Sequence, residues 1–600
     1  MRESKNRFYW WSIIGPVVSA GIALCLICIS MQIWRMDLSV PMEFSGDSCL
    51  GAGLAKSIVE RGIKGIYFSY RLGAPGFSSL IDTPFIDFPY GVLLYIISRF
   101  VSNPNCILYI AYIITFPLSA LTMNILLSKL NVHHPLINVF FSVAFAITPY
   151  HFLRGINHLT LSTYYIIPIA IYIAVILYEE DFKGIIPSRY YSAKWKAILL
   201  YFGCLFLGIS NIYYAFFGLM SIIVAYVAKL IKHKNIKFVI ISFIREAFII
   251  YSVFLGVILG LLPKIIYTLI NGKNAVAAVR APLETELYCL KIVQLILPAS
   301  YNRISILAKI TNLYSTHSIN INENSCATLG LLGTIGFVFA CGWIIKKMTR
   351  SDDSDNTLTR NRITLFSFII LCMLLYATMG GFGTIVSFAV TAELRGVNRC
   401  SIYIACLSLA LLSMVTSKLQ DKILMSKHNF AFVISLLLTG VFVLYTELPV
   451  YAVDVVSGNV QQDQELKAFF SEVENKMPEN AMIYELPFME FPESASIEKM
   501  GEYEPMLGYI YTNTLQWSYG GIKGRNNDAQ NLYVDNGMSI SFVNNIIKAG
   551  FKGVYIDTSG YSDGGNAIIS FYSDKLNLTP IVSEDKKLYF YDISSMNNVN

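Results

Sequence analysis

Long apolar stretches recur along this chain and constrain its fold more than any other feature. Windows of about 20 apolar residues, the length that a helix needs to cross a bilayer, occur repeatedly between residues 9 and 447. Of the 600 residues, 54% are hydrophobic and only 14% are charged. We therefore predict a polytopic α-helical membrane protein, with membrane lipids as partners and no nucleic acid.

The apolar stretches predict about eleven transmembrane helices, and the count depends most on the two around 208–218. The predicted spans are 9–32, 104–128, 136–151, 159–178, 197–211, 213–231, 246–269, 326–345, 363–379, 400–417 and 429–447. Cytoplasmic loops are enriched in lysine and arginine. Eleven helices place the basic clusters within 183–196, 229–237, 346–362 and 418–427 all inside. The N-terminus is then cytoplasmic, and residues 451–600 lie outside.

Two domains are expected from the change in composition near residue 450. Residues 1–450 form the transmembrane domain, with a long first outer loop at 35–103. The polar segment 451–600 is predicted to be a small α/β domain. Its predicted strands are 481–488, 552–560 and 587–593, and its predicted helix, 540–550, ends at Gly550.

Acidic residues in the first outer loop are the first candidates for chemistry. Asp47, Asp82 and Asp87 lie between two apolar spans. Carboxylates this close to hydrocarbon are costly unless they are paired or face a wet cavity. Asp47 begins a segment, 48–61, whose pattern predicts a helix lying along the membrane surface; a second such helix is expected at 90–101. The alternatives are that Asp47 only caps its helix, or that the loop is a solvated linker.

Cations in the later outer loops are candidates for binding a phosphate. Arg280, Lys291 and Arg303 lie close to apolar sequence, and arginine can grip a phosphate through two hydrogen bonds. The alternative is a surface helix whose charged face is merely solvated. Arg395 and Arg399 follow an apolar piece that is too short to cross the membrane.

Arg154 and His158 occupy a short outer turn between two predicted spans. A single histidine in such a turn is more often a hydrogen-bonding cap than a base. No one of these groups is specific alone, and their expected gathering on one face of the membrane is the signal.

These features resemble the GT-C superfamily of integral membrane glycosyltransferases. The matching elements are the Asp47 loop and the strings RLGAP (71–75), DFP (87–89) and RGINHLTLS (154–162), with LRGVNR (394–399) and LQWSYGGIKGR (515–525) as weaker matches. The sequence departs from better-studied members because Ser48, and not a second acid, follows Asp47. This departure leaves open which carboxylate is the base and whether a metal takes part.

The resemblance implies a bacterial enzyme of the cytoplasmic membrane that transfers a sugar from a polyprenyl-phosphate carrier to an extracytoplasmic glycan or lipid-linked acceptor, with inversion. Asp47 would be the base, with Asp82 and Asp87 as further candidates. The substrate-binding residues would be Arg280, Lys291, Arg303, Arg395, Arg399, Arg154 and His158. No cofactor is expected, and the eleven cysteines show no metal-ligand spacing.

Two other functions compete with this interpretation. A flippase or transporter of lipid-linked saccharides would show internal repeats and charges at mid-bilayer, and the sequence has no evident repeat. A catalytically silent protein of polysaccharide assembly is the second alternative. The tail aromatics Tyr511, Trp517 and Tyr519 either stack on acceptor sugars or pack in the domain core.

Overall fold

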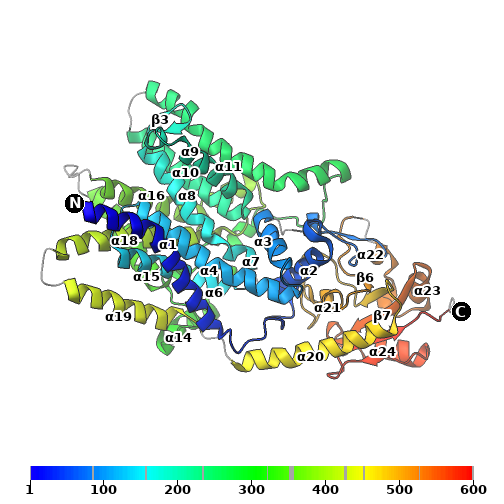
Figure 1. Cartoon of the computed structure of the whole chain (residues 1–600). Coiled ribbons are helices and arrows are strands. Elements are labelled where there is room, and N and C mark those ends of the chain that lie inside the picture. The colour runs from blue at the N-terminus through cyan, green and yellow to red at the C-terminus, as the bar shows by residue number, and fades with distance from the viewer. Residues whose placement is uncertain are drawn as a thin grey trace.

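The protein is mainly helical, as the sequence predicts, with a small sheet domain near its C-terminus (Figure 1). The computed structural model describes residues 2–83, 87–155, 158–232, 236–319, 322–349, 357–424, 429–449, 453–525 and 528–596. Within these ranges, 10 helical segments are long and apolar enough to cross a membrane. The chain is therefore a multi-pass membrane protein. Lys234, Arg350 and Lys427 of the basic clusters, and residues 156–157 of the RGINHLTLS string, lie outside the described residues.

The membrane-crossing segments follow the predicted spans closely. They are α1 (Arg2–Met31), α4 (Pro104–Lys129), α5 (Pro135–Ala146) with α6 (Pro149–Arg154), α7 (Leu159–Ser162) with α8 (Ile167–Glu179), α10 (Ile212–Lys232), α11 (Ile236–Asn271), α15 (Gly330–Thr349), α16 (Leu358–Ala377), α18 (Ser401–Leu424) and α19 (Asn429–Glu447). The remaining predicted span, 197–211, corresponds to α9 (Lys194–Ile209), which has 16 residues.

Close glycine contacts join the short α9 to α11. A Cβ atom on Gly208 would lie 2.1 Å from the Val253 carbonyl oxygen, and one on Gly256 would lie 2.3 Å from the Leu205 carbonyl oxygen. Small residues let two helix backbones approach in this way, and the approach increases their van der Waals contact. Alanine at either glycine would push the two helices apart.

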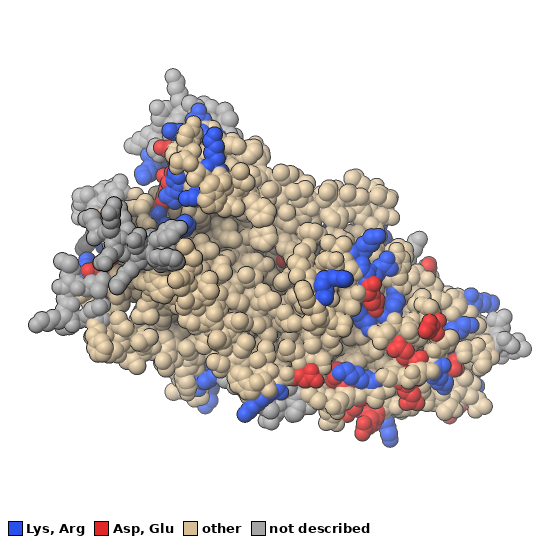
Figure 2. Space-filling view, in the orientation of Figure 1, with Lys and Arg blue, Asp and Glu red and all other residues tan. Residues whose placement is uncertain are grey.

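Charged side chains concentrate at the two ends of the molecule. The N-terminus and the β3 segment (Phe182–Lys183) lie at one end, and the C-terminal domain lies at the other (Figure 1). Figure 2 shows a broad belt between them with few charged side chains on the face in view. Such a belt suits the hydrocarbon core of a bilayer.

The C-terminal domain contains a five-stranded mixed sheet. The strands are β5 (Met482–Leu486), β6 (Gln516–Trp517), β7 (Phe551–Asp557), β8 (Ile581–Val582) and β9 (Leu588–Asp592), in the order β6-β5-β7-β9-β8. β5 pairs in parallel with β6 and β7, and β9 is antiparallel to β7 and β8. The three predicted strands are β5, β7 and β9, and the predicted helix is α23 (Ile540–Lys548), which is followed by Gly550 at φ 96°.

Both faces of this sheet are covered, so alternate side chains enter different cores. Tyr484 and Val554, which are paired in register, pack with Phe542 of α23 on one face. On the other face Tyr555 contacts Phe470 of α20 (Val453–Lys476). A parallel strand pair buried on both sides explains why β5 and β7 are largely apolar.

The first outer loop packs against this domain, which corrects one expectation. Its helix α2 (Gly46–Arg61) forms as predicted, but Ser48–Ile58 are all buried, so α2 does not lie on the membrane surface. Lys56 donates hydrogen bonds to the carbonyl oxygens of Ile510 (2.8 Å) and Thr512 (2.6 Å). The expected second helix of the loop is α3 (Phe88–Ser98).

Candidate active site

A cavity of about 850 Å³ lies between the membrane helices and the C-terminal domain. The start of α2, the turn before α7, the first turn of α10 and the second half of α11 form one part of its wall. The loops that follow α11 and α17 (Phe382–Ala389), together with Glu323 and with residues 493–503 and Lys523 of the C-terminal domain, complete it. Among the predicted site residues, Asp47, His158, Arg280, Arg395 and Arg399 line this one cavity.

Asp47 and His158 form a hydrogen-bonded pair inside the cavity. The Asp47 Oδ2 atom lies 2.8 Å from His158 Nδ1, and the two side chains are 46% and 31% exposed. Asp47 lies in the first turn of α2, but Ser45, and not Asp47, is the N-cap residue. The Asp47 carboxylate is therefore not used as a cap, and it remains accessible to a molecule in the cavity.

Arg280 and Arg395 enter the cavity already bound to carboxylates. Arg280 makes a two-pronged contact with Glu493 of the C-terminal domain, at 2.7 Å and 2.5 Å. Arg395 lies 2.5 Å from Glu284 and 3.5 Å from Glu493. A forked contact of this kind fixes the plane of the guanidinium group. Arg395 is also stacked 4.8 Å from the centre of the Tyr288 ring.

Arg399 shares the carboxylate of Glu323 with Arg154. Glu323 Oε2 lies 2.9 Å from Arg399 and 2.8 Å from Arg154, whose side chain is only 1% exposed. Burial of Glu323 acts in the opposite sense, but the two arginines hold the pKa of this carboxyl well below its usual range. Glu323 is therefore ionised at neutral pH. Arg154 lies behind the cavity wall and positions Glu323 and Asn398.

The C-terminal domain contributes a second acidic group near Asp47. Burial raises the pKa of Glu502, and the neighbouring carboxylates of Asp47 and Glu493 raise it further. Altogether the wall carries five cations and six carboxylates, so it is not a uniformly positive surface that would attract any anion. Its arginines are instead held in place by acids, which is an arrangement suited to stabilising charge that develops at a fixed position.

Comparisons with known proteins give similar structures but no family match. No protein-family model matches the sequence, and no curated protein matches it. Archaeal oligosaccharyltransferase AglB from Archaeoglobus fulgidus, in complex with an inhibitory peptide and a dolichol-phosphate, is 13% identical over 99% of this chain and 74% of that chain, with a TM-score of 0.43.

Two other solved structures are similar at the same level. Arabinofuranosyltransferase AftD from Mycobacteria is 12% identical over 97% of this chain and 40% of that chain (TM-score 0.45). ArnT from Cupriavidus metallidurans bound to undecaprenyl phosphate is 10% identical over 96% of this chain and 97% of that chain (TM-score 0.40). Similarity this low does not assign an activity to this chain. An activity has to be inferred from the residues that line the cavity.

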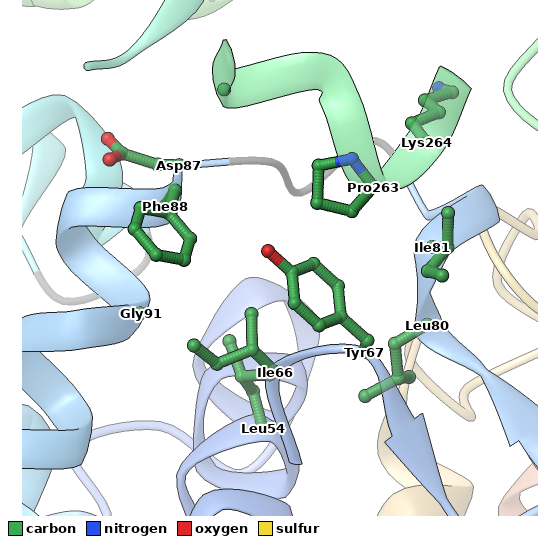
Figure 3. Close-up of a pocket in the computed structure, with 11 residues that line it drawn as sticks. Leu54, Ile66, Tyr67, Leu80, Ile81, Asp87, Phe88, Gly91, Pro263 and Lys264 are labelled. Carbon is green, nitrogen blue, oxygen red and sulfur yellow. The ribbon is translucent and has the colours of Figure 1, made fainter. Parts of the chain in front are cut away.

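Asp87 does not line the large cavity. It caps α3, where Oδ1 accepts a hydrogen bond from the Tyr90 N–H at 3.1 Å, and its side chain is buried. Burial raises the pKa of Asp87 to about 7, although the Tyr90 hydrogen bond opposes this rise. Asp87 borders a separate small pocket, and Figure 3 shows its carboxylate pointing away from Tyr67 and Lys264.

Asp82 is also used structurally. Its carboxylate accepts a 2.7 Å hydrogen bond from Arg525 Nε, and the Nη1 and Nη2 atoms of Arg525 donate to the carbonyl oxygens of Asn271 and Gly272 at the end of α11. This contact ties the first outer loop to the C-terminal domain. Asp82 is buried and does not line the cavity.

Lys291 and Arg303 likewise lie outside the cavity. Lys291 donates to Ser318 Oγ at 2.9 Å and to the Ile319 carbonyl oxygen. Arg303 donates to the Leu448 carbonyl oxygen at 3.1 Å and lies over the Tyr445 ring. Both cations hold loop segments together.

The tail aromatics belong to the core. Trp517 is fully buried and Tyr519 is 4% exposed, so neither can stack on a sugar in this structure. Tyr511 stacks on Phe470 of α20 and donates to Asp463 at 2.7 Å. The packing alternative is therefore the correct one for these three residues.

Sequence reasoning missed several wall residues. Glu323, Glu493 and Glu502 lie in polar stretches where nothing marks one acid above another. Lys264 could have been selected from the sequence as a candidate site residue, because it is a charged residue beside Pro263 within an apolar span. Among the described residues, no group of three or more His, Cys, Asp or Glu side chains is placed to hold a metal ion.

Proposed function

We propose that this protein is a membrane glycosyltransferase that moves a sugar from a polyprenyl-phosphate carrier to an extracytoplasmic glycan or lipid-linked acceptor. The observation that supports this proposal is the Asp47–His158 pair, open to a cavity that arginines also line. A carboxylate suited to take a proton and cations suited to an anionic leaving group are the two requirements of such a transfer.

In the proposed reaction, the acceptor hydroxyl attacks the anomeric carbon of the donor sugar. The new glycosidic bond forms as the bond between that carbon and the phosphate oxygen breaks, with inversion. Asp47 accepts the hydroxyl proton, and the bonding electrons leave on the carrier phosphate. His158 holds the Asp47 carboxylate in one orientation through the 2.8 Å hydrogen bond.

The arginines stabilise the charge of the leaving phosphate. Arg280, Arg395 and Arg399 are already oriented by Glu493, Glu284 and Glu323, so little reorganisation is needed when charge develops. A phosphate that enters the cavity competes with these carboxylates for the guanidinium groups. Arg154 supports this set from behind through Glu323.

The basic clusters support a cytoplasmic N-terminus and an extracytoplasmic C-terminal domain. The proposed location, the bacterial cytoplasmic membrane, follows from the resemblance to GT-C enzymes. The cavity, which the C-terminal domain helps to form, would then open outside. This is the side on which a lipid-linked donor and a surface glycan would meet.

The test is transfer by the purified protein in proteoliposomes. A panel of labelled polyprenyl-phosphate sugars is supplied with glycan acceptors, and both labelled product and released polyprenyl phosphate are measured. We expect the two to appear in equal amounts with at least one donor. Movement of an intact lipid-linked saccharide across the bilayer, without a new glycosidic bond, would contradict the proposal and favour a flippase.

A further inference from the structure

We propose that Lys264 of α11 binds the phosphate of the lipid-linked donor where the cavity meets the bilayer. This inference rests on the proposed function and adds a residue that the sequence patterns did not select. Lys264 lines both the 850 Å³ cavity and the small pocket of Figure 3. In that view it follows Pro263 on the wall opposite Phe88 and Asp87.

Lys264 differs from the other cations of the cavity in its pairing. Arg280, Arg395 and Arg399 each contact a carboxylate, and Lys523 donates to the Glu493 carbonyl oxygen at 2.8 Å. Within the described part of the chain, Lys264 has neither a hydrogen bond nor an ion pair. Among the described residues, an anion that enters the cavity can therefore bind Lys264 without displacing a partner from it.

The position of Lys264 along its helix favours a lipid over a free anion. It lies seven residues before the end of α11 at Asn271, which corresponds to about 10 Å of helix. The membrane span of α11 covers Arg245–Asn271, and only 22% of the residues in its apolar window are buried within the protein. A lysine within an apolar span is costly without a counter-charge or water, and a lipid phosphate can supply that charge.

The apolar side chains that α11 exposes suit contact with lipid, but they do not lie on the Lys264 side of the helix. Leu262, Ile265, Ile266 and Leu269 are 41%, 38%, 48% and 80% exposed, and the 3.6-residue period turns them away from Lys264. In the proposed complex the isoprenoid chain lies in the bilayer beside α11, and only its phosphate reaches the ammonium group of Lys264 at the edge of the cavity. The sugar would then extend into the cavity that contains Asp47. The alternative is that Lys264 only extends its charged end into water.

Binding measurements in nanodiscs separate these alternatives. The probes are undecaprenyl phosphate, which carries the chain, and inorganic phosphate, which lacks it. The variants of the full-length protein are Lys264→Gln, Lys264→Arg and, as a matched control, Lys273→Gln. Lys273 is exposed beyond the end of α11 and does not line the cavity.

We expect Lys264→Gln to weaken undecaprenyl phosphate binding by about tenfold or more, because a hydrogen bond to a charged group is lost. Lys264→Arg should restore most of the affinity, and Lys273→Gln should match the wild type. Inorganic phosphate should bind far more weakly in every variant. Equal lipid affinity in Lys264→Gln and wild type would overturn the proposal, as would equally tight binding of inorganic phosphate.

Transfer kinetics distinguish a failure of this inference from a failure of the proposed function. Lys264→Gln should raise the donor KM by about the same tenfold factor and change kcat much less. Sugar transfer with an unchanged donor KM would remove Lys264 from the site and leave the proposed function intact. Lysine-dependent lipid binding without any transfer would uphold the inference and contradict the proposed function.

Discussion

Asp47 and Asp87 stand near the two ends of the first outer loop, and both lie at the start of a helix. Asp47 is 46% exposed in the large cavity and pairs with His158. Asp87 is 6% exposed, caps α3 and has a pKa raised to about 7. The two carboxylates look equivalent in sequence, yet one is available to a substrate and the other supports a helix. An acid near a membrane span is therefore a catalytic candidate only when a cavity reaches it.

The largest expected effect is a difference in turnover between variants of these two acids. Asp47→Asn keeps the size of the side chain but removes its basicity, so turnover should fall by about 10²–10⁴-fold. Asp87→Asn is the matched control, because asparagine also caps helices well, and its turnover should stay near the wild-type value. Initial rates under saturating donor and acceptor measure both. Near-normal turnover in Asp47→Asn with a loss in Asp87→Asn would reverse the assignment.

The cations of the outer loops give a second, smaller contrast. Arg280 lines the cavity, whereas Arg303 holds the end of α19. Arg280→Ala should weaken donor binding by about 1.5–3 kcal/mol, the usual contribution of a hydrogen bond to a charged group. Arg303→Ala should leave donor affinity unchanged. Donor titration of folded, purified variants measures this difference, and equal affinities would place the phosphate away from Arg280.

The third contrast concerns stability and pH. The folded pKa of Asp87 is about 7, above its ordinary value of 3.8, because burial disfavours the charged form. The folded state therefore binds the proton more tightly, and its stability should fall as pH rises from about 4 to about 7. Relative to Asp87→Asn, the wild type should lose on the order of 2 kcal/mol between pH 5 and pH 8. Thermal unfolding in detergent at both pH values checks this, and parallel curves would contradict it.

The architecture could be predicted because its signals are local. Apolar length marks the spans, and alternation with turn residues marks β5, β7 and β9. The surroundings of α2 could not be predicted, because its sequence pattern shows one apolar face. Its burial on all sides depends on Met506 and Tyr509 of the C-terminal domain, which lie far along the chain.

The cavity could be predicted only in part, for a similar reason. Arginines beside apolar sequence drew attention to Arg280, Arg395 and Arg399. The carboxylates that pair with the arginines could not be predicted in this way. Glu493 is 213 residues from Arg280, and Glu323 is 169 residues from Arg154. Charge pairing across such separations is decided by tertiary packing. Lys291 and Arg303 carried the same sequence signal as Arg280 and were drawn into structural contacts instead.

The most direct measurement is a structure of the Asp47→Asn variant bound to its lipid-linked sugar donor, determined in nanodiscs. The variant should bind the donor and turn it over too slowly to consume it. We predict the sugar in the 850 Å³ cavity, with its anomeric carbon facing residue 47 and its phosphate among Lys264 and the arginines. An acceptor added to the same sample should place its hydroxyl about 2.6–3.2 Å from the side chain at position 47. A donor bound outside this cavity, with its sugar remote from position 47 and His158, would contradict the central claim.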